Sequence, residues 1–172
     1  IAAWVGIPSS ELCFAPGATG ATLLSLLTFA TSDSQLLIEC PIYEPMLVQA
    51  ERVGHAERLL RRPESEWRLP LEDIEKMIGP ETSAIMITEP HNPSGRFAPS
   101  QEVVELAELA AKHDALLLIN EVYREYSERP SYHGMADNIV ILSSLSKLMG
   151  AYWVRLGWIS AREELISKLR VA

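Results

Sequence analysis

The chain has 172 residues, of which 48% are hydrophobic and 22% charged, a composition typical of one globular domain with a full core. Its formal net charge of −8 argues against a nucleic-acid partner. The sequence shows neither an apolar stretch long enough to cross a membrane nor a signal peptide, so we expect a cytoplasmic protein without a membrane partner. Cys13 and Cys40 lie in apolar runs, which is typical of reduced, buried thiols.

Apolar runs bounded by turn residues alternate with helical patterns along the chain. We predict strands over residues 11–15, 36–40, 55–61, 83–89, 115–120, 138–145 and 154–160. We predict helices over residues 19–30, 44–53, 71–78, 100–113 and 161–171, the fourth with Ser100 as its N-cap. The opening IAAWVGI is interpreted as the tail of a helix that begins upstream, in a longer protein. The basic run Arg58 to Arg62 is interpreted as a solvated strand edge or an interface.

Several predicted strands are apolar on both faces, as in a parallel sheet covered by helices on both sides. The predicted fold class is therefore α/β, a three-layer αβα sandwich around a mostly parallel seven-stranded sheet. Ligands of such folds bind at the carboxyl ends of the strands. We therefore expect the ligand-binding and catalytic residues to follow the carboxyl ends of the strands.

The turn after the first strand contains Gly17, Ala18 and Thr19 and opens a helix. Small residues at a helix start let backbone N–H groups approach an anion such as phosphate. The alternative is that Gly and Thr serve only the turn geometry. Tyr43 follows the second strand, where its ring would either pack in the core or stack on a flat ligand.

Polar groups also follow the later strands. Two prolines bracket Asn92 and hold its amide in one direction, unless the segment is a plain loop. Asn120 and Tyr123 follow the strand ALLLI. These groups would lie together at one edge of the sheet.

Lys147 follows the last parallel strand in the segment SSLSK, which also contains Ser144. We expect this lysine to be partly desolvated, which would make its amine nucleophilic, although a lysine after a strand is usually a surface residue. Arg155 interrupts the apolar stretch YWVRLGW, and an arginine there indicates an anion. Together these strand ends describe a site for a flat aromatic aldehyde that carries a phosphate and forms a Schiff base with the amine. We expect no metal site.

Three segments, SLSKLMGAYWVRLGW, EPHNPSG and NEVYREY, resemble the motifs of the pyridoxal-phosphate-dependent aminotransferases of class I/II, fold type I. The resemblance implies a large cofactor-binding domain over residues 1–172, without the N-terminal segment and the C-terminal small domain of the family. It implies pyridoxal 5′-phosphate as cofactor, amino acid and keto acid substrates, amino-group transfer and a homodimer. The arginine that binds the substrate carboxylate in the family has no counterpart in this sequence.

Phosphate would be held, according to this resemblance, by backbone N–H and hydroxyl groups at the start of the first large helix and by two later side chains. These residues are Gly17, Ala18, Thr19, Ser144 and Arg155.

The same resemblance gives the groups around the ring their roles. Lys147 would form the Schiff base and move the proton during catalysis. Tyr43 would stack on the pyridine ring. Asn92 and Tyr123 would bind the ring oxygen.

Asn120 departs from the family, in which an aspartate pairs with the pyridine nitrogen. An amide can hydrogen-bond this nitrogen but supplies no negative charge to hold its proton, so the sequence predicts impaired transamination. The amide marks a natural divergence, an engineered change or a pseudoenzyme. Glu89 is a second departure and is interpreted as facing the loop.

Other readings stay open at this stage. The same scaffold carries C–S lyases, decarboxylases and a cyclopropane-forming synthase, which fold and cofactor do not separate. A non-catalytic ligand-sensing domain of aminotransferase type is an alternative outside the enzymes. A generic α/β domain without cofactor would leave the strand-end residues as coincidences.

Overall fold

A computed structural model describes residues 1–147 and 149–171 of the chain. Its central feature is a seven-stranded sheet in the order β1-β7-β6-β5-β4-β2-β3. The strands are β1 (Leu12–Pro16), β2 (Gln35–Cys40), β3 (His55–Leu60), β4 (Thr82–Thr88), β5 (Leu116–Asn120), β6 (Ile139–Ser144) and β7 (Leu156–Ser160). Strand β7 pairs antiparallel with both β1 and β6, and the other neighbours pair parallel. The prediction of a mostly parallel seven-stranded sheet is confirmed.

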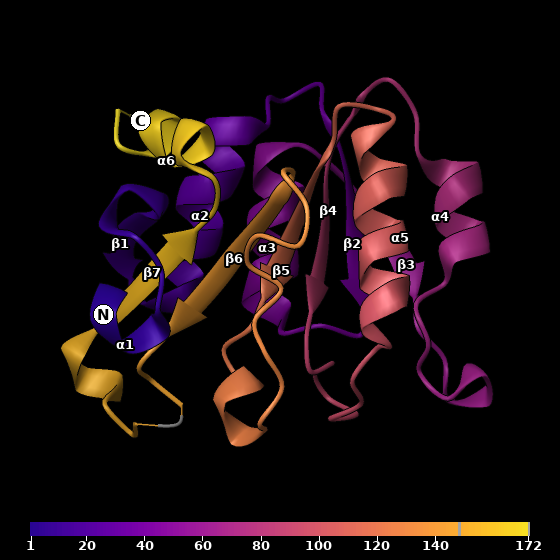
Figure 1. Cartoon of the computed structure of the whole chain (residues 1–172). Helices are drawn as coiled ribbons and strands as arrows, with labels where there is room; N and C mark the ends of the chain where they lie inside the picture. Colours follow the sequence, from indigo (N-terminus) through magenta and orange to yellow (C-terminus); the bar gives the residue numbers. More distant parts are fainter. Residues whose placement is uncertain (148, 172) are drawn as a thin grey trace.

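Helices cover both faces of this sheet (Figure 1). They are α1 (Ala2–Val5), α2 (Gly17–Phe29), α3 (Glu44–Val53), α4 (Leu71–Met77), α5 (Ser100–Ala111) and α6 (Glu163–Leu169). Residues of α4 and α5 pack in one core cluster with the sheet, and residues of α2, α3 and α6 pack in the other. The predicted three-layer αβα architecture follows, because each face of a parallel sheet must be covered.

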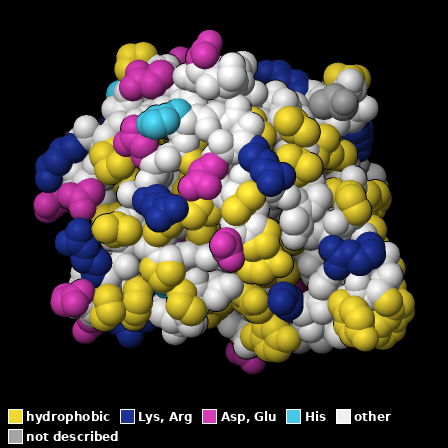
Figure 2. Space-filling model, turned by 180° about the vertical axis from the view of Figure 1, so that it is seen from behind, with side chains coloured by type: hydrophobic (Ala, Val, Ile, Leu, Met, Phe, Trp, Pro, Cys, Tyr) yellow, Lys and Arg dark blue, Asp and Glu magenta, His cyan; other side chains and the backbone are white. Residues whose placement is uncertain are grey.

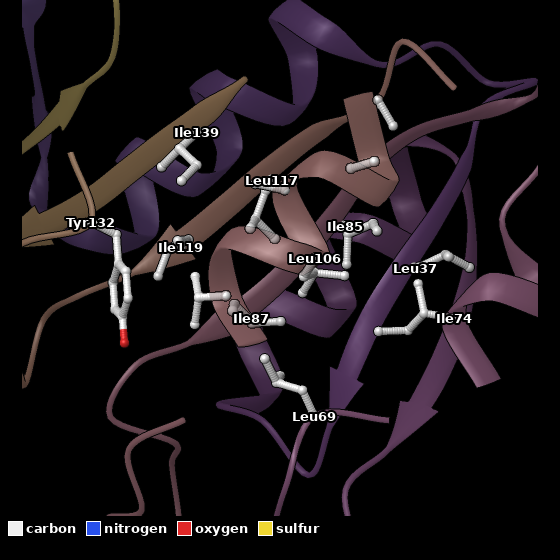
Figure 3. Packing of buried hydrophobic residues seen from close by; sticks show 14 of the residues in the cluster. Leu37, Leu69, Ile74, Ile85, Ile87, Leu106, Leu117, Ile119, Tyr132 and Ile139 are labelled. Atoms are coloured by element: carbon white, nitrogen blue, oxygen red, sulfur yellow. The ribbon is translucent and has the colours of Figure 1, made fainter. Parts of the chain in front are cut away.

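Side chains alternate between the two cores along each strand. In β2, Leu36 and Ile38 enter the cluster under α2 and α3, whereas Leu37 enters the cluster under α5. Figure 3 shows Leu37 beside Ile74 of α4, and Ile85 and Leu117 of the sheet near Leu106 of α5. Burying each such side chain contributes roughly 1.5–3 kcal/mol, so the two clusters fix the sheet between its helices.

Some element boundaries differ from the prediction. Pro99, not Ser100, is the N-cap of α5, and no side-chain hydrogen bond caps this helix. Strand β7 begins at Leu156 because Tyr152–Val154 form a 3₁₀ turn and Arg155 has a positive φ of 52°. The backbone therefore becomes extended after the arginine.

Buried charges overturn two interpretations. Arg61 was expected on a solvated edge, yet it is 3% exposed and its Nη1 donates to Glu39 Oε2 at 2.6 Å and to Glu89 Oε1 at 3.0 Å. Glu89 is fully buried rather than facing the loop. The interpretation of a solvated edge holds for Arg58, which is exposed on the edge strand β3. Cys13 is half-buried rather than buried.

Acidic and basic side chains are interspersed with hydrophobic ones across the back of the molecule (Figure 2). Within the part of the chain that the structure describes, none of the helices combines the length and the apolarity needed to cross a bilayer. Over the same residues, no group of three His, Cys, Asp or Glu side chains is placed to hold a metal ion.

Candidate active site

A cavity of about 210 Å³ opens at the carboxyl ends of the parallel strands. The structure brings nine of the predicted site residues to its wall: Ala18, Thr19, Tyr43, Asn92, Asn120, Tyr123, Ser144, Lys147 and Arg155. Gly17, the tenth, lies just behind this wall, against Arg155. The residues come from six separate segments, which the parallel topology places at one edge of the sheet.

One end of the cavity is built for an anion. Helix α2 begins at Gly17 without a side-chain cap, so the N–H groups of its first turn lack intrahelical partners. Gly17 has a φ of 72°, and a β-carbon on it would lie 2.5 Å from Nη2 of Arg155. The guanidinium therefore lies directly against the helix start. Both features favour a bound negative charge.

Gly157 of β7 lets this helix start approach the sheet. A β-carbon on Gly157 would lie 2.4 Å from the carbonyl carbon of Gly17, which is closer than any real contact. The glycine in the sequence RLGW therefore has a structural reason that sequence reasoning did not find.

Lys147 lies on the rim of the cavity, after β6. It is exposed rather than partly desolvated as expected, and its Nζ lies 5.4 Å from the centroid of the Tyr123 ring. The position leaves the amine accessible to a ligand in the cavity. Tyr43 is also half-exposed, at 51%, so its ring is free of the core and faces the site.

Asn120 lies at the buried end of the cavity, 4% exposed. Its Oδ1 accepts the backbone N–H of Val122 at 3.1 Å, and its Nδ2 lies 3.1 Å from Sδ of Met46. A backbone N–H can only donate and a thioether can only accept, so both neighbours favour the same amide orientation. This orientation leaves one N–H of the amide, and one lone pair of its oxygen, for a ligand.

Glu121, next to Asn120, does not line this cavity. Its carboxylate accepts the backbone N–H of Tyr132 at 2.7 Å and the hydroxyl of Ser131 at 2.8 Å. Burial raises the pKa of Glu121 to about 7, opposed by these hydrogen bonds and by Arg124. The residue holds the segment after β5 rather than the ligand.

Four wall residues were missed: Met46, Val122, Ser146 and Tyr152. Ser146 could have been found, because it lies beside Lys147 in SSLSK. Met46 and Val122 are apolar, and nothing in their local sequence separates them from core residues. Tyr152 reaches the cavity from a 3₁₀ turn, Tyr152–Val154, which was not predicted and of which only Val154 falls within the predicted strand.

A second hollow of about 380 Å³ adjoins the first and shares Asn92 and Tyr123 with it. Its wall is mostly aromatic side chains and prolines, including Phe97 and Tyr126. The two hollows meet at the side chains that were predicted to bind a ring oxygen.

The sequence matches the family model described as aminotransferase class I and II over residues 1–172. It is 28% identical over 173 residues to an aromatic-amino-acid aminotransferase of Thermococcus litoralis, covering 94% of this chain and 44% of that protein. It is 34% identical over 142 residues to an arginine–pyruvate transaminase of Pseudomonas aeruginosa, covering 76% of this chain and 36% of that one.

Solved structures agree with these sequence matches. A PLP-dependent aminotransferase from Streptococcus suis superposes with a TM-score of 0.85 at 27% identity, over 94% of this chain and 44% of that one. An aspartate aminotransferase from Thermotoga maritima shares the fold, with a TM-score of 0.86 at 19% identity. The match covers 98% of this chain and 47% of that one. The chain thus spans less than half the length of these relatives.

Proposed function

Because this chain belongs to the class I and II aminotransferases, we propose that it binds pyridoxal 5′-phosphate and is the cofactor-binding large domain of an aminotransferase. The reaction would move an amino group between an amino acid and a 2-keto acid. The observation that carries the proposal is the pairing of an anion-binding helix start with an accessible lysine in one cavity. When bound, the cofactor supplies an aldehyde for the amine and a ring that accepts electrons from the substrate.

The phosphate would lie at the start of α2. The free N–H groups of Ala18 and Thr19 and the Thr19 hydroxyl would donate to its oxygens, and Gly17 keeps the backbone close. Arg155 would add a charge-assisted donor and Ser144 a hydroxyl at the end of β6. The fit rests on the uncapped helix start and on the guanidinium that already lies against it.

The ring would lie between Tyr43 and the sheet, with its oxygen toward Asn92 and Tyr123. An amide N–H and a phenol hydroxyl can both donate to a phenolate oxygen. Lys147 would present its amine to the aldehyde and later hold a proton near the reacting carbon. Each of these side chains lines the cavity.

The ring nitrogen would meet the NH₂ group of Asn120, because this group otherwise contacts only a weakly accepting thioether, whereas the amide oxygen already accepts a backbone N–H. A donor at this point pairs with an unprotonated nitrogen and disfavours a protonated one. A close ion pair at intermediate dielectric is worth roughly 4 kcal/mol, and each ~1.4 kcal/mol corresponds to about tenfold in rate. We infer a weaker electron sink and proton abstraction slower by a few orders of magnitude.

Asn120 also supports a second candidate function. A domain that binds the cofactor but turns substrate over slowly could act as a ligand-sensing domain, or run chemistry that needs a weaker electron sink. Detection of keto acid product, as against pyruvate with ammonia or carbon dioxide, separates transamination from C–S lyase and decarboxylase activity.

We further propose that the protein acts as a homodimer in the cytoplasm. Two aromatic side chains beside the cavity are largely exposed, Tyr152 at 67% and Trp153 at 69%. Exposed aromatic groups of this kind are typical of protein interfaces. Cys13 and Cys40 are free thiols, as expected in a reducing compartment.

The test is to add pyridoxal 5′-phosphate to the purified chain, record the absorbance spectrum, reduce with borohydride and map the modified peptide. The proposal predicts a reduced adduct on Lys147 that is absent from Lys147→Arg and retained by the surface control Lys76→Arg. Labelling spread evenly over the exposed lysines, or none at all, would contradict it.

A further inference from the structure

A buried group of charged side chains lies at the ends of β2, β3 and β4, and the proposed chemistry does not use it. Arg61 Nη1 bonds both Glu39 and Glu89, and all three side chains are at most 1% exposed. The second oxygen of each carboxylate accepts a backbone N–H, from Thr88 and from Ala98, both at 2.9 Å. These bonds fasten three strand ends and the segment before α5 into one platform.

His91 rests on this platform with its side chain fully buried. Its Nε2 lies 3.1 Å from the Pro41 carbonyl oxygen, and its Nδ1 lies 2.7 Å from Oγ of Ser94. A carbonyl oxygen can only accept, so Nε2 carries the proton and Nδ1 accepts the Ser94 hydroxyl. Burial, reinforced by the charge of Arg61, lowers the pKa of His91 to about 4, which preserves this neutral form.

Further contacts hold His91 on its other sides. Ser94 Oγ accepts the N–H of Arg96 at 3.2 Å while its own hydrogen is used by the ring. The Trp67 ring lies against the imidazole, with centroids 5.4 Å apart, and the Trp67 carbonyl accepts Nε of Arg61 at 2.6 Å. Trp67 has a positive φ of 60°, which a non-glycine residue adopts at a cost. The residue that covers the imidazole is thus also one with an unfavourable backbone conformation.

The Nε2 bond of the imidazole joins two segments that both reach the cavity, while the Nδ1 bond stays within the Asn92 loop. Pro41 lies two residues before Tyr43, and Asn92 directly follows His91. The His91 N–H and carbonyl also bond Arg96 and Gly95 and close the Asn92 loop. A single side chain therefore connects the tyrosine side of the cavity to the asparagine side.

We propose that His91 is a positioning residue that fixes the separation of Tyr43 and Asn92 through its Nε2–H bond to the Pro41 carbonyl. The proposal rests on the proposed function for the identity of the ligand between these two side chains. The linkage itself is a property of the chain without ligand. The identity of the ligand and the linkage through His91 can therefore be tested separately.

The test compares His91→Gln with His91→Asn. The glutamine amide nitrogen reaches the place of Nε2 and can still donate to Pro41, whereas asparagine reaches only the place of Nδ1 and leaves that carbonyl without its donor. Amide exchange is measured by NMR in the cofactor-free chain at Gly95 and Met46, whose N–H groups bond His91 and Tyr43 carbonyls. Exchange at both amides should rise about tenfold or more in His91→Asn and stay within about threefold of the wild type in His91→Gln.

A cofactor titration supplies the second readout. The dissociation constant for pyridoxal 5′-phosphate should rise about tenfold in His91→Asn and be restored in His91→Gln. Wild-type exchange in His91→Asn, or equally fast exchange in both variants, would overturn the proposal. If the wild-type chain forms no Lys147 adduct, the proposed function fails while the exchange comparison still decides the positioning role.

Ser94→Ala covers the case in which His91→Asn does not fold. It removes the hydroxyl that donates to Nδ1 and accepts the Arg96 N–H, so the ring loses the contact that orients its Nε2–H toward the Pro41 carbonyl. Faster exchange at both Gly95 and Met46, by a smaller factor than in His91→Asn, is the expected result. Unchanged exchange at Met46 would overturn the linkage between the two segments.

Discussion

Gly157 in β7 lies directly beneath Gly17 at the start of α2, so close that a β-carbon on Gly157 would come within 2.4 Å of the Gly17 carbonyl carbon. The contact is between backbones and cannot be relieved by a rotamer change. It sets how deep the helix start lies, and with it the anion-binding end of the cavity.

Gly157→Ala should therefore displace the start of α2. We expect a loss of about 1–3 kcal/mol in the free energy of unfolding and about a tenfold or greater loss of cofactor affinity. Urea unfolding and cofactor titration measure the two effects. Gly134→Ala is the control, since its φ of 74° gives strain but its β-carbon meets open space. Unchanged cofactor affinity in Gly157→Ala would contradict the expectation.

Asn120→Asp should protonate the ring nitrogen of bound cofactor. The new carboxylate keeps the Val122 N–H bond and supplies the missing charge, at a distance where it is worth roughly 4 kcal/mol. With ¹⁵N-labelled cofactor, the ring-nitrogen shift should move from the unprotonated to the protonated range. The rate of reaction with an amino acid should rise by a few orders of magnitude.

Met46→Leu is the matched control for this change, because it removes the sulfur beside Asn120 and keeps the volume. It should leave the ring nitrogen unprotonated. A protonated nitrogen in the unmodified chain would refute the orientation argument for Asn120.

Arg155→Gln should weaken binding through the phosphate alone. A charge-assisted hydrogen bond contributes about 1.5–3 kcal/mol, so affinity for pyridoxal 5′-phosphate should fall roughly tenfold to a hundredfold. Affinity for pyridoxal, which lacks the phosphate, should be unaffected. Arg162→Gln, on the half-exposed surface after β7, is the control. Equal losses of affinity for both ligands would show that Arg155 does not act through the phosphate.

Stability should fall as pH rises from about 6.5 to 8.5. Burial raises the pKa of Glu39 to about 8 and of Glu121 to about 7, and both lie near 4.5 in the unfolded chain. A carboxyl group whose pKa is raised by folding contributes its full stabilisation at pH values below its pKa in the unfolded chain. This stabilisation is lost as the pH rises through the pKa in the folded chain. Below about 6.5 the lowered pKa of His91 acts in the opposite sense, so the window begins there.

Urea unfolding at half-unit pH steps measures this dependence. The unmodified chain should lose on the order of 2 kcal/mol across the window. Glu39→Gln should remove the upper part of the fall and Glu121→Gln the lower part. Arg61 and the raised pKa of Glu89 remain in both variants, so some slope should persist. A flat or rising profile in the unmodified chain would contradict the assignment.

Trp153→Asp should shift a dimer toward monomer. The indole is 69% exposed beside the cavity, and a charge there would disfavour a buried interface. Sedimentation equilibrium should show a higher dissociation constant than for the unmodified chain. Leu60→Asp, at the opposite edge of the sheet, should leave it unchanged. A monomeric unmodified chain would refute the dimer.

Sequence reasoning located most of the cavity wall because strand-end residues were recognisable from apolar runs that stop at polar groups. Asn92, Asn120 and Lys147 could be read this way. The antiparallel direction of β7 could not, because an apolar run carries no information on strand direction. The wall residues Met46 and Val122 are apolar and look like any core residue.

The buried charges were beyond local reasoning. Arg61 lies in a basic run, and such runs are usually solvated, but its partners Glu39 and Glu89 are 22 and 28 residues away. No pattern within the run indicates them. Likewise, Lys147 is exposed, although the small and apolar residues around it in the sequence predicted partial burial.

The reversed direction of β7 has a consequence for how this site could change over time. Because β7 starts at the edge where β6 ends, with Ser144 opposite Gly157, a single connection carries Lys147 and Arg155 and returns to the same edge. Insertions or deletions within that connection would alter the reach of the amine without shifting the register of either strand. The fold thereby separates the connection that carries the reactive amine from the strands that frame the site, so new ligand geometries can be sampled at little risk to folding.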